Sequence, residues 1–498
     1  MKVKTTAGAV SGVSLGKSGV TVFKGIPYAH AERWRPPVAP QPWAGVRECD
    51  EFGPICPQKP TNNWPMDEDC LSINIWTPQV SRGASLPVLI WIYGGRFCFG
   101  ASRDPQYDGA AMAAKGVVFV SLNYRLGVFG WLSTPELVDE SGGGAGNYGL
   151  LDQMAALRWV RDNIAEFGGD PARVTIAGQS AGAASVMLLA YSPLAQGLFR
   201  SVIALSGASH PGDPGLWFRA GSYRTKAMAN IQGVSFLAEH GATTIAQARR
   251  LPVAGLLEDS DSDDWSVLGD HQPPLFRPLL DGHVMTGPYW RTLAQGTSQP
   301  ISVMTGTVKD EDGASPQKVI SLTEFHLAAQ NDYGSMADEF LSLYPAANDD
   351  EAAAMSNQAA NDLSRTSTNL WARLWGRHNT AFTYFWTHTP PGPNAKRDGA
   401  YHSGEIWYFL DSLGADPSRP FTDDDYQIAS VTSGLVANFV ATGNPNTDPS
   451  TPIWPTPVGE PGQSGVAMEL GDNFGAIPVA TDARFDFHRR FLESNPQR

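Results

Sequence analysis

Residues 174–189 read VTIAGQSAGAASVMLL and contain the motif on which the fold prediction depends. The β-branched beginning of this stretch predicts a short strand, and its apolar end predicts a helix. Between them, Gly178 and Gly182 flank Ser180 in the pattern G-x-S-x-G, which is typical of a sharp turn that exposes a serine at a helix N-terminus. Side chains at the two glycine positions would collide with neighbouring backbone. The spacing therefore predicts a strained strand–turn–helix unit with Ser180 at its tip.

Strand-like and helix-like segments alternate on both sides of this motif. Residues 86–93 and 116–122 are apolar on both alternating faces, which is typical of central strands covered by helices on each side. From Leu151 to Phe167, apolar residues recur at helical spacing before a Gly-Gly stop. This alternation indicates βαβ units and predicts an α/β fold with a mainly parallel central sheet flanked by helices.

Length and charge limit the domain organisation and the class of partner. The chain has 498 residues, of which 42% are hydrophobic and 17% charged, so it can bury a large core. We expect one α/β domain over residues 1–498, with helical insertions at about 210–300 and 330–375 that form the rim of a pocket. The net charge of −14 gives no basic footprint for nucleic acid. No run of about 18 apolar residues occurs, so no membrane span is expected.

The serine needs two partners before it can act as a nucleophile. Its hydroxyl is weakly nucleophilic at neutral pH and needs an imidazole to accept its proton, with a carboxylate that orients the imidazole. In strand–turn–helix sites of this kind, the acid and then the histidine follow the serine along the chain. Nine histidines follow Ser180, at positions 210, 240, 271, 283, 326, 378, 388, 402 and 488. Composition alone does not choose among them.

Several motifs in the chain resemble the type-B carboxylesterase family, the relatives of cholinesterases. Residues 167–182 resemble the serine signature of the family, and residues 68–76, EDCLSINIW, resemble its second signature. Further matches occur at residues 23–29, 123–127, 146–153, 438–439 and 443–446. The resemblance covers nearly the whole chain and implies an α/β-hydrolase fold. It also implies a serine ester hydrolase that needs no metal and no organic cofactor.

The resemblance assigns roles to further side chains. His402, in the segment YHSGEI, resembles the catalytic histidine of the family, and the same segment carries a glutamate three residues later. Glu311, at the end of GTVKDE, resembles the triad acid. The family usually has glycine directly after that glutamate, whereas Asp312 follows here, so Asp310 and Asp312 remain alternatives. Ser206 resembles a second serine that supports the triad from behind, or it is a plain buried hydroxyl.

The segment YGGRF at residues 93–97 resembles the glycine-rich oxyanion loop of the family. By position, the backbone N–H groups of Gly95, Arg96 and Ala181 would stabilise the negative oxygen of the tetrahedral intermediate. Arg96 stands where a third glycine is usual. Its guanidinium either forms a structural salt bridge or recognises a carboxylate on the substrate, because its planar fork suits bidentate pairing.

The residue before the nucleophile also bears on the substrate. Gln179 stands where cholinesterases have a glutamate that favours cationic substrates, so with Arg96 it predicts a pocket for an anionic small-molecule ester. The family includes bacterial enzymes that remove tricarballylate esters from fumonisin-type mycotoxins, and a polycarboxylate acyl group of that kind would fit. The alternatives are a broad neutral aryl or alkyl esterase of the nitrobenzyl-esterase type and, in another class, a non-catalytic interaction protein with this fold.

The four cysteines lie in the first fifth of the chain, at Cys49, Cys56, Cys70 and Cys98. We expect a Cys56–Cys70 disulfide, which would close a 15-residue loop and contribute roughly 3 kcal/mol; the alternative is four free thiols. A disulfide implies a periplasmic or secreted protein whose signal peptide is not part of this sequence, while free thiols leave a cytoplasmic location open. Trp64 lies inside this loop, as a cation-binding tryptophan does in cholinesterases. We interpret Trp64 as packing at the rim of the substrate pocket.

Overall fold

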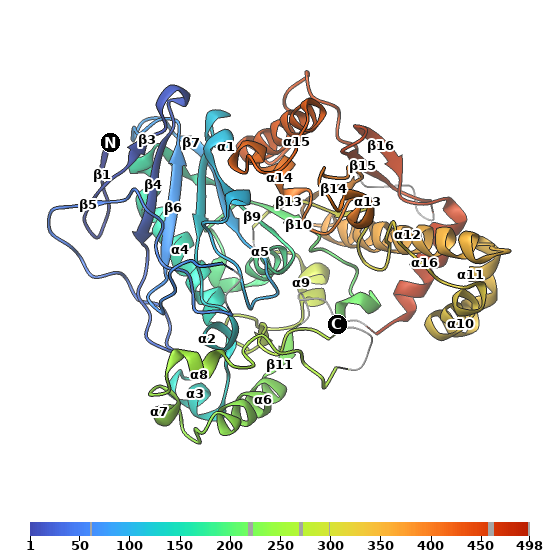
Figure 1. Ribbon diagram of the computed structural model, residues 1–498, viewed down its shortest axis with the longest axis horizontal. Helices are drawn as coiled ribbons and strands as arrows, with labels where there is room; N and C mark the ends of the chain where they lie inside the picture. Colours follow the sequence, from blue (N-terminus) through green and yellow to red (C-terminus); the bar gives the residue numbers. More distant parts are fainter. Residues whose placement is uncertain (60–61, 218–222, 268–271, 298, 457–462, 497–498) are drawn as a thin grey trace.

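The computed structural model describes residues 1–59, 62–217, 223–267, 272–297, 299–456 and 463–496. Within these residues, an eleven-stranded sheet forms the centre of the molecule, in the order β16-β15-β14-β13-β10-β9-β7-β8-β6-β4-β3 (Figure 1). The strands are β3 (Val13–Ser14), β4 (Thr21–Pro27), β6 (Ser72–Thr77), β7 (Leu86–Ile92), β8 (Val118–Leu122), β9 (Gly169–Gln179), β10 (Ser201–Leu205), β13 (Ser302–Val308), β14 (Thr380–Trp386), β15 (Val466–Leu470) and β16 (Gly475–Pro478).

The seven neighbouring strands from β8 to β15 run parallel, and antiparallel strands complete both edges. The two apolar segments predicted as central strands are β7 and β8. A small separate sheet of β1 (Lys2–Lys4), β2 (Ala9–Ser11) and β5 (Val46–Glu48) lies beside it, and β11 (Arg224–Thr225) pairs with β12 (Leu279–Leu280). The prediction of a mainly parallel α/β fold is confirmed.

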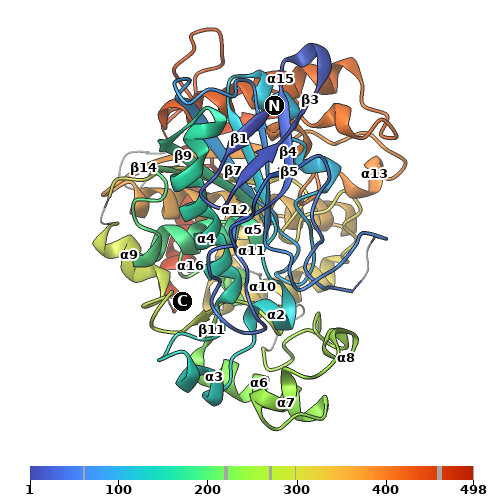
Figure 2. The same cartoon turned by 90° about the vertical axis from the view of Figure 1, so that its left-hand side faces the viewer.

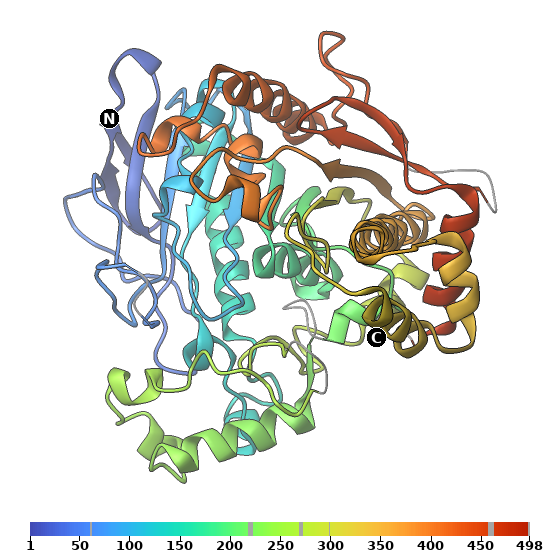
Figure 3. The same ribbon diagram turned by 45° about the vertical axis from the view of Figure 1, so that its right-hand side comes forward.

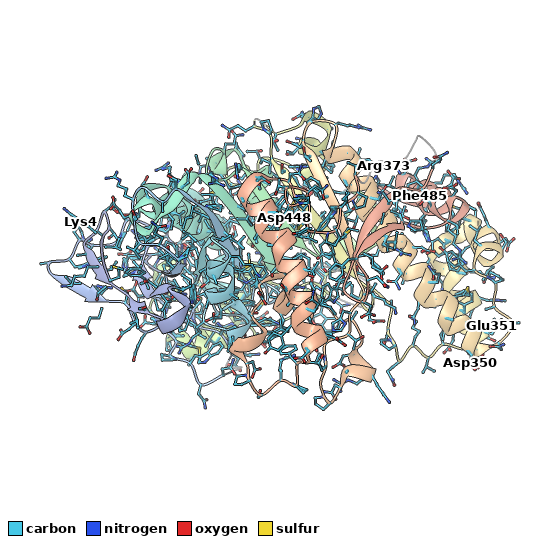
Figure 4. The ribbon with its side chains drawn as sticks, turned by 90° about the horizontal axis from the view of Figure 1, so that it is seen from above. Lys4, Asp350, Glu351, Arg373, Asp448 and Phe485 are labelled. Atoms are coloured by element: carbon cyan, nitrogen blue, oxygen red, sulfur yellow. The ribbon has the colours of Figure 1, made fainter. Side chains whose placement is uncertain are left out.

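Helices cover both faces of the sheet (Figures 1 and 4). On one face, α4 (Tyr148–Asn163), α5 (Ala181–Tyr191) and α12 (Asp349–Trp375) pack against β9, β10, β13 and β14. On the other face, α1 (Ala110–Ala114) contacts β6 and β8, and α15 (Asp423–Thr442) contacts β7 and β9. Helix α5 is apolar around its whole circumference and buried from Ala181 to Ala190, as expected for a helix enclosed on all sides.

The described residues contain further helices besides these. They are α2 (Gly127–Trp131), α3 (Pro135–Glu140), α6 (Lys226–Glu239), α7 (Ile245–Ala248), α8 (Val253–Leu257), α9 (Tyr289–Gln295), α10 (Leu322–Tyr333), α11 (Ala337–Leu343), α13 (Ala395–Asp398), α14 (Ile406–Phe409) and α16 (Asp482–Ser494). In the described residues, no helix has both the length and the apolar character that crossing a membrane requires.

The two ranges expected to be helical insertions differ from each other. In 210–300, α6, α7 and α8 gather with α3 at one end of the molecule (Figures 2 and 3), and much of the rest is irregular. Buried charged side chains stabilise these loops, because Arg224 donates to the carbonyl of Trp131 at 2.6 Å and Arg277 pairs with Asp264 at 2.8 Å.

In the second range, α12 extends from the periphery onto the sheet and contacts β13 and β14. It also contacts α16 and α10, around a small apolar core that includes Phe325, Phe340 and Phe487. Figure 4 shows Arg373 of α12 next to Phe485 of α16, where the guanidinium carbon lies 4.9 Å from the ring centroid. Much of α12 is therefore part of the helical cover of the sheet.

The structure has no Cys56–Cys70 disulfide, so that prediction is wrong. All four cysteines are free, buried thiols. The Cys70 thiol is hydrogen-bonded to Cys56, and Cys56 Sγ accepts a hydrogen bond from the backbone N–H of Leu126 at 3.2 Å. The bond to Cys56 and burial raise the pKa of Cys70 well above its ordinary value, which disfavours the thiolate that disulfide formation requires. A periplasmic or secreted location, which rested on this bridge, stays a prediction.

Candidate active site

Ser180 lies on the turn between β9 and α5 in strained backbone. Its φ of 57° and ψ of −124° lie in a region that disfavours residues with a side chain. A Cβ atom added to Gly178 would lie 2.5 Å from the carbonyl group of Gly182, and one added to Gly182 would lie 2.1 Å from the carbonyl oxygen of Ile92. Both glycines are therefore required by contact, which is the steric reason inferred from the G-x-S-x-G pattern.

The register of the sheet brings distant segments to one edge. In the four neighbouring parallel strands β9, β10, β13 and β14, the successive cross-strand partners are Gln179, Leu205, Gly306 and Tyr384. Ser180 directly follows its partner residue at the end of β9, and Ser206 does so at the end of β10. Glu311 lies three residues beyond the end of β13, and His402 lies in the segment between β14 and α14. Because the carboxyl ends of parallel strands share an edge, these four side chains gather above the sheet.

Glu311 contacts His402 directly. The Nδ1 atom of His402 lies 2.6 Å from Glu311 Oε2, and the carboxylate is almost fully buried. Its other oxygen accepts hydrogen bonds from Ser206 Oγ and from the backbone N–H of Val308, both at 2.9 Å. These partners hold the carboxylate in one orientation, so it keeps the Nδ1–H tautomer of the imidazole and makes Nε2 the nitrogen that can accept a proton.

The charges of this pair support each other. Burial lowers the pKa of His402, but the hydrogen bond to Glu311 and its negative charge outweigh this and raise the pKa above 6.5. Burial also raises the pKa of Glu311, but the hydrogen bond and charge of His402 lower it below its ordinary value. The His402 side chain is 47% exposed, so its far edge is open to an incoming substrate. An ionised carboxylate behind an accessible imidazole is suited to general-base chemistry.

The far edge of the imidazole contacts Gln179. The Nε2 atom of Gln179 lies 3.1 Å from Nε2 of His402, the ring nitrogen that a catalytic base would use, and the amide donates to this nitrogen when the ring is neutral. Among the described residues, no hydrogen bond joins His402 to Ser180. Since Gln179 directly precedes Ser180, the imidazole is nevertheless close to the serine, and such hydrogen bonds often tighten only when substrate is bound.

The loop after β7 lies against the serine turn. A Cβ atom added to Gly94 would lie 2.5 Å from the carbonyl oxygen of Gln179 and 3.2 Å from Cβ of Ser180. Gly95 has a φ of 99°, and Arg96 follows with a φ of 54°, in the left-handed region that favours glycine. Ala181 is the first residue of α5, where backbone N–H groups have no partner within the helix. The geometry can therefore present N–H groups from both segments next to Ser180.

The guanidinium of Arg96 binds a carboxylate of the same chain. Its Nη2 forms an ion pair with Asp263 and a longer hydrogen bond, 3.4 Å, to the carbonyl oxygen of Gln272. Both side chains of the pair are partly exposed, 46% for Arg96 and 37% for Asp263. Of the two interpretations of Arg96, the salt bridge is the arrangement present in this structure. The acidic run around Asp263 is visible in the sequence, but nothing in it points to Arg96 as a partner.

The other predicted site residues lie around this centre. Asp310 accepts a hydrogen bond from the backbone N–H of Ala400 at 2.8 Å, so it anchors the segment that carries His402. Asp312 has a φ of 54° and raises the pKa of His402 through its charge. Trp64 stacks against Arg103, whose guanidinium carbon lies 5.4 Å from the ring centroid. No described contact joins Trp64 to the triad.

Glu405 is a buried carboxyl group close to this centre. It has no exposed surface, and no side chain among the described residues forms a hydrogen bond to its oxygens. Burial and the charge of Glu311 raise its pKa to about 8, so it is mostly protonated at neutral pH. Its position three residues after His402 was the only signal in the sequence, and that signal does not reveal its protonation state.

Comparison with known proteins gives consistent matches over the chain. The model of the carboxylesterase family matches residues 1–474. The fumonisin B1 esterase of Sphingopyxis macrogoltabida is 35% identical over 464 residues, which cover 89% of this chain and 82% of that protein. The para-nitrobenzyl esterase of Bacillus subtilis strain 168 is 30% identical over 478 residues, covering 90% of this chain and 91% of that protein.

Two further matches agree with these. The cocaine esterase of Homo sapiens is 31% identical over 493 residues, covering 90% of this chain and 84% of that protein. A solved structure of PNB esterase superimposes with a TM-score of 0.77 and 30% identity, covering 99% of both chains. The similarity thus extends over the sheet, the helices and the segments that carry the site.

Proposed function

The chain belongs to the carboxylesterase family and is a serine ester hydrolase, and from this premise we propose that Ser180, His402 and Glu311 carry out the reaction. His402 Nε2 accepts the proton of Ser180 Oγ while Oγ attacks the carbonyl carbon of the ester. Glu311 keeps Nδ1–H oriented and stabilises the imidazolium that forms. The observation that carries the proposal is the 2.6 Å contact between His402 and Glu311 beside the strained Ser180 turn.

The tetrahedral intermediate then needs a site for its negative oxygen. The backbone N–H groups of Gly95, Arg96 and Ala181 are the proposed donors, because their segments border Ser180. His402 returns the proton to the departing alcohol, which leaves an ester on Ser180. A water molecule, deprotonated by His402, attacks that ester and releases the carboxylic acid and free Ser180.

The side chain of Gln179 has to move during this catalytic cycle. Its amide occupies Nε2 of His402 in the structure, so it must turn aside when that nitrogen accepts the proton of Ser180. A rotated amide presents its carbonyl oxygen to the imidazolium, and the same side chain could then accept from the protonated ring. The bond to Gln179 therefore leaves the proposed base available.

Labelling with a fluorophosphonate, an active-site reagent for serine hydrolases, tests the nucleophile. Native protein should be labelled on Ser180, and Ser180→Ala should remain unlabelled and lose about 10⁴-fold or more in kcat on a p-nitrophenyl ester. Mass spectrometry of the labelled peptide identifies the residue. Ser206→Ala is the matched control, because it removes a neighbouring hydroxyl and should still be labelled. Equal labelling of native protein and Ser180→Ala would refute the proposed nucleophile.

For the substrate, we propose esters whose acyl part carries a carboxylate. Two observations support this class: Arg96, whose planar guanidinium suits a carboxylate, lies in the loop beside Ser180, and the chain is similar to a protein named fumonisin B1 esterase. The measurement is hydrolysis of fumonisin B1 next to a neutral p-nitrophenyl ester, on native protein and on Arg96→Gln. A preference for the acidic ester that Arg96→Gln removes would support the class.

Neutral aryl or alkyl esters are the second candidate, and the Asp263 contact favours them. Because Asp263 already neutralises Arg96, the resting pocket has less unpaired positive charge than the sequence suggests. The similarity to para-nitrobenzyl esterase points the same way. If native protein and Arg96→Gln hydrolyse both kinds of ester in the same ratio, this second class is the correct one.

A further inference from the structure

The acidic segment 258–264, EDSDSDD, forms two partly exposed ion pairs near the carboxyl edge of the sheet, besides a buried pair at Asp264. Asp263 pairs with Arg96 in the loop beside Ser180. Two residues earlier, Asp261 pairs with Lys59 at 2.5 Å. Both pairs are similarly exposed, with side-chain values of 37% for Asp263 and 40% for Asp261. The segment therefore offers two chemically matched ion pairs, of which only one involves the proposed site.

Buried polar contacts hold this segment at both ends. Ser260 Oγ accepts a hydrogen bond from the backbone N–H of Val128 at 3.0 Å. Asp264 accepts from Arg277 at 2.8 Å, and both of these side chains are almost completely buried. Since Asp263 lies between the two anchors, its position against Arg96 is set by the fold and not by a freely moving loop.

The Arg96 side of the pair is unusual. Arg96 has a φ of 54°, where a residue with a side chain is disfavoured relative to glycine, in a loop that directly borders the serine turn. Its planar guanidinium is the side chain best suited to grip a carboxylate. The structure thus shows an arginine with left-handed backbone, in the loop that borders the serine turn, whose guanidinium already binds a carboxylate.

We propose that Asp263 is a specificity-determining residue. It occupies the guanidinium of Arg96 in the resting protein, and a carboxylate on the ester substrate replaces Asp263 in that ion pair. This inference rests on the proposed hydrolysis of esters at Ser180 and deepens its substrate class. Asp263 acts as an internal competitor, because every acidic ester must displace it from the guanidinium. Exchange is feasible because an ion pair this exposed is weak.

The test uses two matched esters, p-nitrophenyl hydrogen glutarate and p-nitrophenyl valerate, which differ mainly in a terminal carboxylate. Asp263→Asn keeps the shape of the side chain and removes the competing charge. The ratio of kcat/KM for the acidic ester to that for the neutral ester should rise about 3- to 5-fold, through a lower KM. The upper value follows from a pair worth about 1 kcal/mol, which is about fivefold.

Asp261→Asn is the control, because it removes the same charge from the same segment but at Lys59. It should leave the ratio within about twofold of native, since screening at physiological salt weakens charges that are not in contact. Arg96→Gln supplies the third arm and should lower the ratio. Circular dichroism and thermal melts of each variant establish that the fold is retained.

The outcomes separate this inference from the proposed function. A rise in Asp263→Asn, none in Asp261→Asn and a fall in Arg96→Gln support the inference. Equal rises in the two aspartate variants would overturn it, since general charge repulsion would then be the cause. No rise in Asp263→Asn would also overturn it, whatever Arg96→Gln does. Hydrolysis of the valerate ester, and its loss in Ser180→Ala, tests the proposed function in every case.

Discussion

Two histidines of this protein are each linked to a carboxylate, but their pKa values are shifted in opposite directions. His402 contacts Glu311 directly and has an open edge. His488, on α16, is completely buried, and its Nε2 lies 2.8 Å from the hydroxyl oxygen of Tyr344. Tyr344 in turn donates to Asp362 at 3.0 Å, so a tyrosine stands between the second imidazole and its carboxylate.

The hydroxyl between His488 and its carboxylate, together with the burial of the ring, gives His488 a pKa shift opposite to that of His402. Burial, followed by the charge of Arg484, lowers the pKa of His488 to about 3, whereas Glu311 raises the pKa of His402 above 6.5. Since Tyr344 gives its proton to Asp362, the Nε2–H of His488 donates to the hydroxyl oxygen and the ring stays neutral. The comparison shows that a carboxylate raises the pKa of a histidine when it is hydrogen-bonded directly to the imidazole and the charged ring remains accessible to solvent.

Removing the carboxylate that touches His402 should have the largest effect. Glu311→Gln leaves an amide that cannot stabilise the imidazolium, so kcat should fall about 10⁴-fold. The acid limb of kcat/KM against pH should also move to lower pH, because the pKa of His402 is no longer raised. Both are measured with a neutral p-nitrophenyl ester. Asp312→Asn, one residue away, is the control, and a greater loss in that variant would identify Asp312 as the acid.

The buried histidine should control stability in acid. Its folded pKa is lowered, so below pH 6.5 the unfolded chain binds a proton that the folded protein does not. The contribution of the neutral His488 ring to the free energy of unfolding is therefore complete above pH 6.5. It is lost as the pH falls, by about 1.4 kcal/mol per pH unit. Urea unfolding at pH 7, 6 and 5 measures the slope.

His488→Gln removes the titrating ring and should make that slope shallower by this amount. His402→Gln supplies the contrast, because the pKa of His402 is raised in the folded protein. The stabilisation that this shift provides is complete below pH 6.5 and is lost as the pH rises through the folded pKa. The acid slope of His402→Gln should not become shallower. Parallel slopes for native protein and His488→Gln would show that the buried ring does not titrate as the comparison requires.

The smallest effect should come from Glu405. This carboxyl is mostly protonated at pH 7, since its pKa is about 8, and glutamine reproduces its neutral form. Glu405→Gln should therefore keep kcat/KM at pH 7 within about threefold of native, and it should abolish an inflection near pH 8. Glu405→Ala leaves a cavity and is the control for packing. A loss of more than tenfold in Glu405→Gln at pH 7 would mean that the carboxyl is ionised there.

The sequence was most informative where a requirement is local. The glycines around Ser180 and the strands β7 and β8 were predictable, because steric limits and apolar periodicity act over a few consecutive residues. His402 and Glu311 were singled out only by resemblance to a family, since nine histidines followed Ser180 and their contacts depend on the register of distant strands. The cysteine prediction failed because spacing describes loop length and not whether the two sulfurs are satisfied as thiols.

By itself, the sequence determined the α/β class, the strained serine turn and the residue types available for the chemistry, because these follow from short-range sterics and composition. Only the tertiary structure decided which carboxylate meets which cation or imidazole. Asp263 is 167 residues from Arg96, and Glu311 is 91 residues from His402. Contacts at such separations, and the proton affinities they produce, depend on how the whole sheet brings its carboxyl ends together.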